Sequence, residues 1–375
     1  MDWKVPYFDL RLDEREKQSV LEVLDSNWLT SGPKIEKFEL SFQKYFNSDI
    51  EAVSVSSATA ALHIALVCFD VGVGDEVILP TFTFVACANV IRSVGATPVF
   101  VDITSENDWN LSISDVASKI TSRTKVIMAV HYAGYPCDLK KLNSLTDGTR
   151  IKILEDCSHA PLVRYKKSML GSFGDIGCFS FYSNKNMTTG EGGMLISSSQ
   201  EIISRARILR SHGITNSTIG RFRGHSFGYD VAEVGFNYRL DELRAAIGMI
   251  QLKKLSENQK KREVAVRNYN ELLTDYKEVL MPFQGRKEKS GHHIFPILIK
   301  NDKIKRDRVI EKMKDHGVQC SVHYKSIHTF SAYQSSDINL PKSEKVSSSL
   351  ISLPLFPDIS PWQQYYVIDC LKKCI

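Results

Sequence analysis

Short apolar runs rich in β-branched residues recur through the first half of the chain, and segments with helical patterning separate several of them. In Thr59–Cys68, for example, Leu62 and Leu66 stand four positions apart with alanines between them. This alternation predicts an α/β fold with a mostly parallel, seven-stranded sheet buried on both faces. The expected strands are Ala52–Val55, Glu76–Leu79, Thr97–Val101, Lys125–Val130, Ile151–Leu154, Cys178–Phe181 and Met194–Ile196.

The pattern changes in the second part of the chain, where a long helix is expected over Leu240–Tyr276, with Leu243, Ile247 and Ile250 on one face. A strand and two further helices are expected at His293–Ile299, Asp307–His316 and Trp362–Lys373. We therefore predict a large domain over residues 1–250 and a smaller C-terminal α/β domain over residues 251–375. The segment Thr215–Val234 is rich in Gly, Ser and Arg and is predicted to form a long loop.

Composition suits a two-domain globular protein, because the 375 residues are 43% hydrophobic and 24% charged. The net charge of +5 is spread along the chain, which argues against a nucleic-acid partner. Eight scattered cysteines without a CxxC pair predict reduced thiols and no structural zinc. The N-terminus lacks the apolar core of a signal peptide, and no apolar run reaches the roughly 18 residues of a membrane span. We therefore expect a cytoplasmic protein.

Three polar segments follow expected strands, at the edge of a parallel sheet where ligands bind. The first is Ser56–Thr59, which opens a helix. Its small residues, hydroxyls and first helical N–H groups suit a phosphate. An ordinary helix N-cap is the alternative, since Ser and Thr are preferred there.

The second segment ends an apolar strand with Glu155 and Asp156, and His159 lies three residues beyond. A carboxylate at this position suits a cationic ring nitrogen, a helix cap or a metal ion, and the residues alone leave these three roles open.

The third segment, Phe179–Gly193, places Lys185 in a hydroxyl-rich turn before a glycine-dense return into a strand. It does not match the Walker A pattern, and no GxGxxG motif follows the first strand. A nucleotide-phosphate role for the lysine is therefore disfavoured, and a Schiff-base amine is favoured over a surface charge. Together the three segments supply the phosphate contacts, carboxylate and lysine that pyridoxal 5'-phosphate requires.

The chain resembles the DegT/DnrJ/EryC1/StrS family of pyridoxal-phosphate-dependent nucleotide-sugar aminotransferases over nearly its whole length. The resemblance implies aminotransferase fold type I. Several motifs look especially like the UDP-4-amino-4-deoxy-arabinose synthase branch. The motifs that carry the family resemblance are Trp28–Pro33, SSATAALHIAL, GDEVILPTFTFVA, GATPVFVDI, ILEDCSHA, FSFYSNKNMTTGEGGM, GFNYRLDELRAAIG, VHYKSIH and SLPLFPDI.

The resemblance implies roles for individual residues. Lys185 sits at the family's Schiff-base position, Asp156 at the carboxylate that pairs with the ring nitrogen, and His159 near the ring 3-oxygen. Phe84 matches the aromatic residue that stacks on the ring. Asn237 matches an asparagine that reaches the phosphate from a partner subunit, which implies a homodimer with shared active sites. The remaining cofactor-binding positions are Ala58, Thr59 and Ser180.

A second set of residues is implied in substrate binding. His323, Tyr324 and His328 resemble a substrate-facing loop, for which a purely structural role is the alternative. We interpret His292-His293 as strand-end packing, not as a metal site, and expect no bound metal. Candidate anion contacts are Arg239, Arg221 and Arg223.

The resemblance implies transfer of an amino group from glutamate or glutamine to a nucleotide-linked keto-sugar, with C4 preferred, for surface-polysaccharide or deoxyaminosugar biosynthesis. Related deoxysugar dehydratases carry histidine where this chain has Lys185, which favours transamination. Three different functions compete with this one: a regulatory family member without turnover, a sugar 3-aminotransferase, and another pyridoxal-phosphate enzyme such as a lyase.

Overall fold

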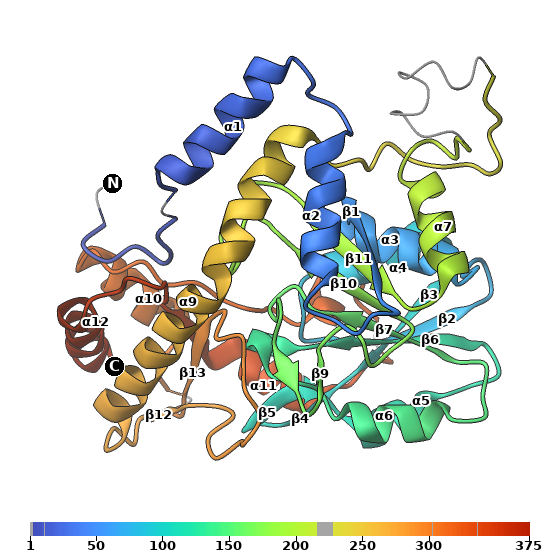
Figure 1. Cartoon of the computed structure of the whole chain (residues 1–375). Coiled ribbons are helices and arrows are strands. Elements are labelled where there is room, and N and C mark those ends of the chain that lie inside the picture. The colour runs from blue at the N-terminus through green and yellow to red at the C-terminus, as the bar shows by residue number, and fades with distance from the viewer. Residues whose placement is uncertain (1–2, 11, 216–227, 302, 336) are drawn as a thin grey trace.

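The computed structural model describes residues 3–10, 12–215, 228–301, 303–335 and 337–375. Its centre is a seven-stranded sheet in which β11 runs antiparallel to both neighbours and the other pairs are parallel (Figure 1). All seven expected strands are found, so the predicted mostly parallel α/β architecture is confirmed. In spatial order the strands are β1 (Glu51–Val55), β11 (Gly193–Ser197), β10 (Ile176–Ser180), β7 (Lys152–Asp156), β6 (Thr124–Val130), β2 (Glu76–Pro80) and β3 (Thr97–Val101).

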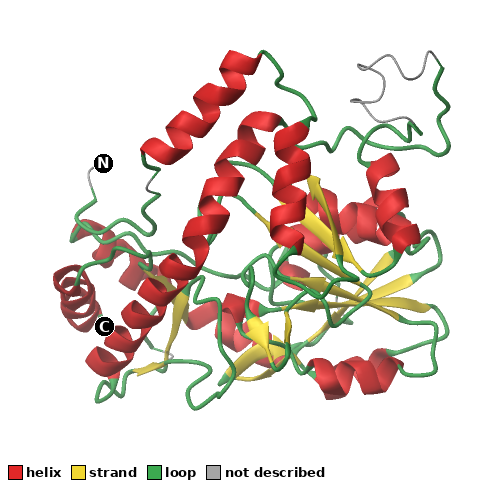
Figure 2. Cartoon of the chain, viewed as in Figure 1, coloured by secondary structure: helices red, strands yellow, loops and turns green. Residues whose placement is uncertain are grey.

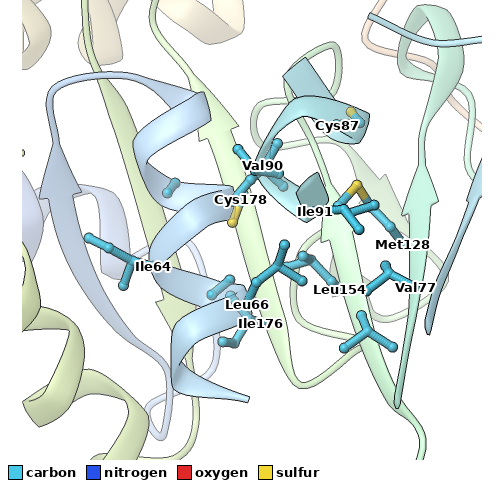
Figure 3. Packing of buried hydrophobic residues seen from close by; sticks show 14 of the residues in the cluster. Ile64, Leu66, Val77, Cys87, Val90, Ile91, Met128, Leu154, Ile176 and Cys178 are labelled. Carbon is cyan, nitrogen blue, oxygen red and sulfur yellow. The ribbon is translucent and has the colours of Figure 1, made fainter. Parts of the chain in front are cut away.

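Helices cover both faces of this sheet (Figure 2). One layer consists of α3 (Ala58–Cys68), α4 (Ala86–Ser93) and α7 (Gln200–Leu209). Figure 3 shows its core, where Ile64 and Leu66 pack with strand residues such as Leu154. The opposite layer consists of α2 (Pro33–Gln43), α5 (Ile113–Lys119) and α6 (Leu139–Thr146). Because successive strand residues point to opposite layers, the buried strands are apolar along their length, without a polar alternate face.

The predicted long helix is α9, Glu242–Leu273, which runs continuously between two hydrophobic cores (Figure 1). Leu252 and Leu255 belong to the core beneath the large sheet, whereas Ala265 and Tyr269 belong to the C-terminal core. The helix therefore crosses the expected boundary after residue 250, and the division into two domains there stays a prediction.

Small residues let the first turns of α9 pack closely against α2. A Cβ atom on Gly248 would lie 2.8 Å from the ring of Phe38, so glycine permits this close approach. The three larger residues expected on one face of this helix, Leu243, Ile247 and Ile250, are only half-buried.

The C-terminal part is built on a three-stranded antiparallel sheet of β12 (Val279–Leu280), β13 (Phe295–Ile299) and β14 (Leu350–Leu353). It contains the expected strand and both expected helices, as β13, α10 (Arg306–Asp315) and α12 (Pro361–Cys374). The remaining elements are α1 (Glu14–Ser26), α11 (Pro341–Ser349), the hairpins β4 (Ile103–Ser105) with β5 (Asp108–Leu111) and β8 (Arg164–Tyr165) with β9 (Ser168–Met169), and 3₁₀ turns at Tyr132–Gly134 and Ile327–Thr329.

Most of the segment expected to be a long loop, including Arg221 and Arg223, lies outside the described residues. Its described end forms an isolated bridge between Val231 and Ile214. Among the helices that the structure describes, none is both long enough and apolar enough to cross a membrane.

Candidate active site

A cavity of about 420 Å³ opens at the carboxyl ends of the parallel strands, between the large sheet and the segment before η2 (Ile327–Thr329). It gathers residues from distant parts of the chain. The residues expected from the sequence that line it are Ala58, Thr59, Phe84, Asp156, His159, Ser180, Lys185, His323 and Tyr324. Of the expected cofactor and substrate residues, Asn237 and His328 are not part of its lining.

One end of the cavity is the N-terminus of α3. Ser57 is its N-cap, and the Ser57 hydroxyl accepts a hydrogen bond from the backbone N–H of Ala60. Among the described residues, the N–H groups of Ala58 and Thr59 have no hydrogen-bond acceptor. A helix cap and a phosphate site are therefore compatible at this turn. The cap satisfies the N–H group of Ala60 and leaves those of Ala58 and Thr59 at the positive end of the helix dipole.

A glycine lets the neighbouring strand lie against this turn. A Cβ atom on Gly193, the first residue of β11, would lie 2.5 Å from the carbonyl carbon of Ser57 and 2.7 Å from the backbone nitrogen of Ala58. The last of the glycines after Lys185 thus has a steric reason: it allows β11 to lie against the start of α3.

The two acids at the end of β7 have separate tasks. Asp156 lines the cavity, and its Oδ1 accepts a hydrogen bond of 2.9 Å from the backbone N–H of Ser158. Glu155 is fully buried away from the cavity, where its carboxylate accepts hydrogen bonds from His131 and from the backbone N–H groups of Gly171, Phe173 and Gly174. The alternation of side chains along a strand separates them.

Sequence reasoning did not single out Cys87, yet its thiol touches Asp156. The thiol donates a hydrogen bond of 3.2 Å to Oδ2 of Asp156, and both residues are buried. Burial and the neighbouring carboxylate of Asp156 raise the pKa of Cys87 well above its usual value. The thiol therefore keeps its proton and fixes the second oxygen of the carboxylate.

Lys185 follows β10 on a turn in which its backbone N–H donates to the carbonyl of Tyr182. The residue keeps some accessible surface, but protein surrounds its amine, and this desolvation lowers the pKa of Lys185 from 10.5 to about 8. The negative charge of Asp156 opposes the effect. The amine therefore loses its proton near pH 8 and not near pH 10.5, and the uncharged form is the one that can act as a nucleophile or base.

A hydrogen bond from the backbone determines which tautomer the neutral ring of His159 adopts. Its Nδ1 accepts a hydrogen bond from the N–H of Ala133, so Nε2 carries the proton and donates to the hydroxyl oxygen of Tyr324, 2.8 Å away. Burial, together with the charge of Lys185, lowers the pKa of His159 well below 6.5. Burial raises the pKa of Tyr324 well above 10, so its own hydroxyl hydrogen is available to a group in the cavity.

Three further expected residues lie away from the cavity lining. His328 is buried beside the cavity, where its ring contacts the hydroxyl of Thr81 at 2.7 Å and the carboxylate of Glu344 at 3.0 Å. Asn237 is exposed on the surface and forms a backbone bridge with Ser211. The Arg239 guanidinium lies 3.3 Å from the Ser211 hydroxyl.

A second contact that sequence reasoning missed involves His293, for which the sequence suggests only strand-end packing. Its ring does pack beside that of His159, with centroids 4.4 Å apart, but its Nε2 also lies 3.4 Å from Nζ of Lys185. No local pattern marks this role, because the partner is far away in the sequence.

The groups that line the cavity fit pyridoxal phosphate. The unpaired N–H groups at the start of α3 suit its phosphate, the hydrogen-bonded carboxylate of Asp156 suits its ring nitrogen, and the amine of Lys185 suits its aldehyde. The ring of Phe84 is 57% exposed at the edge of the cavity, 6.0 Å from that of Tyr324, which leaves its face free to stack on a planar ligand.

Comparison with known proteins places the chain among sugar aminotransferases. Residues 10–372 match the model of the DegT/DnrJ/EryC1/StrS aminotransferase family. The chain is 34% identical to the spore coat polysaccharide biosynthesis protein SpsC of Bacillus subtilis, covering 99% of this chain and 97% of that protein. It is also 34% identical to the GDP-perosamine synthase of Escherichia coli O157:H7, covering 98% of each.

Solved structures agree with this placement. The PMP form of the putative sugar aminotransferase Spr1654 from Streptococcus pneumoniae superposes with a TM-score of 0.92 at 28% identity, over 99% of both chains. The same protein has also been solved in a PLP form. The chain therefore belongs to the DegT/DnrJ/EryC1/StrS aminotransferase family and is a pyridoxal-phosphate-dependent sugar aminotransferase of fold type I.

Proposed function

We propose that this enzyme moves an amino group from glutamate or glutamine to the C4 keto group of a nucleotide-linked sugar, in surface-polysaccharide or deoxyaminosugar biosynthesis. The observation that carries the proposal is the arrangement of Lys185 and Asp156 in one cavity with the free N–H groups of α3. The names of the relatives support the pathway class, since one acts in spore coat polysaccharide biosynthesis and another is a GDP-perosamine synthase.

Pyridoxal phosphate supplies the carbonyl group and the electron sink of the reaction. In our proposal the residues of the chain provide binding and proton transfer. Asp156, held by Ser158 and Cys87, would supply the negative charge for the ring nitrogen of the cofactor. Lys185 would hold the cofactor covalently and, when its amine is free, would accept and return the proton at the reacting carbon.

The side chains around the ring complete the proposed site. Phe84 would stack on the ring, and Ala58, Thr59 and Ser180 would bind the phosphate. His159 would face the ring 3-oxygen, and its neutral Nε2–H is shared with Tyr324. Tyr324 and His323 line the cavity from the C-terminal part of the chain, so they are placed to contact the sugar.

We propose a homodimer in which Asn237 reaches the phosphate of the partner's site. The position of Asn237 supports this, because the residue is exposed and separate from the cavity of its own chain. In the proposed dimer, the phosphate in the partner's site would be the group that this polar side chain contacts. The cytoplasmic location and the roles of Arg239 and His328 stay predictions.

The deciding experiment runs the second half of the reaction on its own. The enzyme is loaded with pyridoxamine phosphate and offered a panel of UDP-, dTDP- and GDP-linked 4-keto and 3-keto sugars. We expect one 4-keto sugar to convert the bound cofactor to its aldehyde form. The absorbance of the cofactor monitors this conversion. Conversion by 3-keto sugars alone would establish a sugar 3-aminotransferase instead.

A regulatory protein and a lyase would each give a distinct outcome in the same experiment. A regulatory protein would bind no cofactor and show no change, whereas a lyase would bind the cofactor but leave its pyridoxamine form unconverted, because it transfers no amino group to a keto-sugar. Donors labelled with ¹⁵N distinguish glutamate from glutamine, because only the true donor transfers its label to the sugar.

A further inference from the structure

His293 and Lys185 meet although they lie 108 positions apart in the sequence. His293 directly precedes Ile294 and β13, and only 4% of its surface is exposed. Its Nε2 lies 3.4 Å from Nζ of Lys185. This is a contact between a buried imidazole and the amine to which the proposed function assigns the covalent and proton-transfer steps.

The hydrogen bonds of Asn186 determine which ring nitrogen carries the proton. The amide Nδ2 of Asn186 donates to the carbonyl of Gly291 at 2.5 Å, so the amide oxygen Oδ1 must face His293. That oxygen lies 3.1 Å from Nδ1 of His293 and accepts a hydrogen bond from it. Nδ1 is therefore protonated, and in the neutral ring Nε2 presents a lone pair to Lys185.

The backbone around His293 keeps the ring in place. Its N–H donates to the carbonyl of Ala133 at 3.3 Å, and its carbonyl accepts from the guanidinium of Arg262 at 3.3 Å. Burial and the charges of Lys185 and Arg262, together with the neighbouring His159 and His323, lower the pKa of His293 well below 6.5. The ring is thus a fixed, neutral acceptor over the pH range in which the enzyme would work.

The charged and polar groups that surround the amine have different tasks. Asp156 attracts the positive charge of Lys185 from the sheet side, but its two oxygens already accept from Ser158 and Cys87. His159 turns a protonated Nε2 toward Tyr324 and uses its Nδ1 for the backbone. Within the described part of the chain, the Nε2 of His293 is the hydrogen-bond acceptor that contacts Nζ of Lys185.

We propose that His293 is a positioning residue for Lys185. It accepts a hydrogen bond from Nζ whenever the amine is not bonded to the cofactor, and so returns the amine to one fixed place and favours its protonated state. Asn186 acts through His293, because it sets the tautomer. This inference rests on the proposed role of Lys185 but concerns a contact that exists without cofactor.

The test measures the pKa of Lys185 in full-length protein freed of cofactor. Trace labelling with acetic anhydride over a pH series, with the Lys185 peptide quantified by mass spectrometry, gives this value. Because an acceptor stabilises the charged amine, His293→Leu should lower the pKa of Lys185 by about one pKa unit, the size of a hydrogen bond to a charged group. His293→Gln retains a hydrogen-bond acceptor at a similar distance from the amine. In this variant the pKa of Lys185 should therefore be close to that of the unaltered protein.

His292→Asn is the matched control, because His292 is the adjacent histidine and its ring packs against Tyr135. This variant should leave the pKa of Lys185 unchanged. An unchanged value in a folded His293→Leu variant would overturn the proposal, as would equal shifts in the Leu and Gln variants. If His293→Leu does not fold, ¹⁵N-histidine spectra of the unaltered protein decide, since a proton on Nε2 of His293 contradicts the proposal. These outcomes do not depend on whether the enzyme aminates a sugar.

Discussion

The carboxylates of Glu155 and Asp156, neighbours at the end of β7, serve opposite sides of the central sheet. Asp156 faces the cavity with Cys87, and Glu155 faces the buried layer with His131. Asp156 lines the cavity, whereas Glu155 holds together the turn between β9 and β10 by accepting hydrogen bonds from three backbone N–H groups. The two adjacent acids can therefore be tested against each other.

Asp156→Asn should lower the rate of amine transfer by about 10²–10³-fold, because in the proposed site it removes the negative charge that would face the ring nitrogen. Glu155→Gln should lower the free energy of unfolding by about 3 kcal/mol, because it breaks a buried charged network, and it should leave the rate of the folded fraction nearly unchanged. Denaturant unfolding and single-turnover rates measure both variants. A reversal of the two effects would show that the roles are assigned to the wrong residues.

The pKa of Lys185 predicts the pH dependence of the proton-transfer step. The amine is charged below about pH 8 and uncharged above it, and only the uncharged form is a base. Single-turnover transfer from pyridoxamine-loaded enzyme should therefore rise with pH through about 8 and then level off. His159 and His293 are held neutral by burial, so they add no second step near pH 6.5. A rate that fell through pH 8 would contradict the assignment of Lys185 as the base.

Tyr324 and His328 belong to the same expected substrate loop, but only Tyr324 reaches the cavity. Tyr324→Phe removes the hydroxyl next to His159 and should slow amine transfer by about tenfold, the equivalent of one neutral hydrogen bond. His328→Leu breaks contacts with Thr81 and Glu344 and should lower the melting temperature with little effect on the rate. Rates measured at equal concentrations of folded protein distinguish an effect on catalysis from an effect on stability. A large loss of rate in His328→Leu would show that His328 does act in substrate binding.

The buried apolar strands were predictable from sequence, because they read as continuous β-branched runs between helical segments. The meeting of Lys185 and Asp156 at one edge of the sheet was also predictable, because each lies at or just after the end of its strand, and both line the cavity. Their roles stay predictions. Cys87 and His293 were not, since their contacts with Asp156 and Lys185 span 69 and 108 positions. Such contacts depend on how the layers pack, and no local pattern encodes them.

The proposed shared active site predicts complementation between two inactive variants. Lys185→Ala and Asn237→Ala should each be severely impaired, but in a mixed dimer one site receives both wild-type residues and the other receives neither. Random reassociation yields half mixed dimers, so about a quarter of the wild-type activity should return. Activity measured after co-refolding tests this, with each variant refolded alone as the control. If mixing restores nothing while mixed dimers form, Asn237 does not complete the partner's site.

The central claim is that Lys185 is the amine that holds the cofactor. The most direct measurement is borohydride reduction of the enzyme with bound pyridoxal phosphate, followed by digestion and peptide mass spectrometry. We expect the added mass on the peptide containing Lys185, and no such mass on Lys185→Ala under the same conditions. Attachment at another lysine, or equal labelling of the Lys185→Ala variant, would contradict the claim.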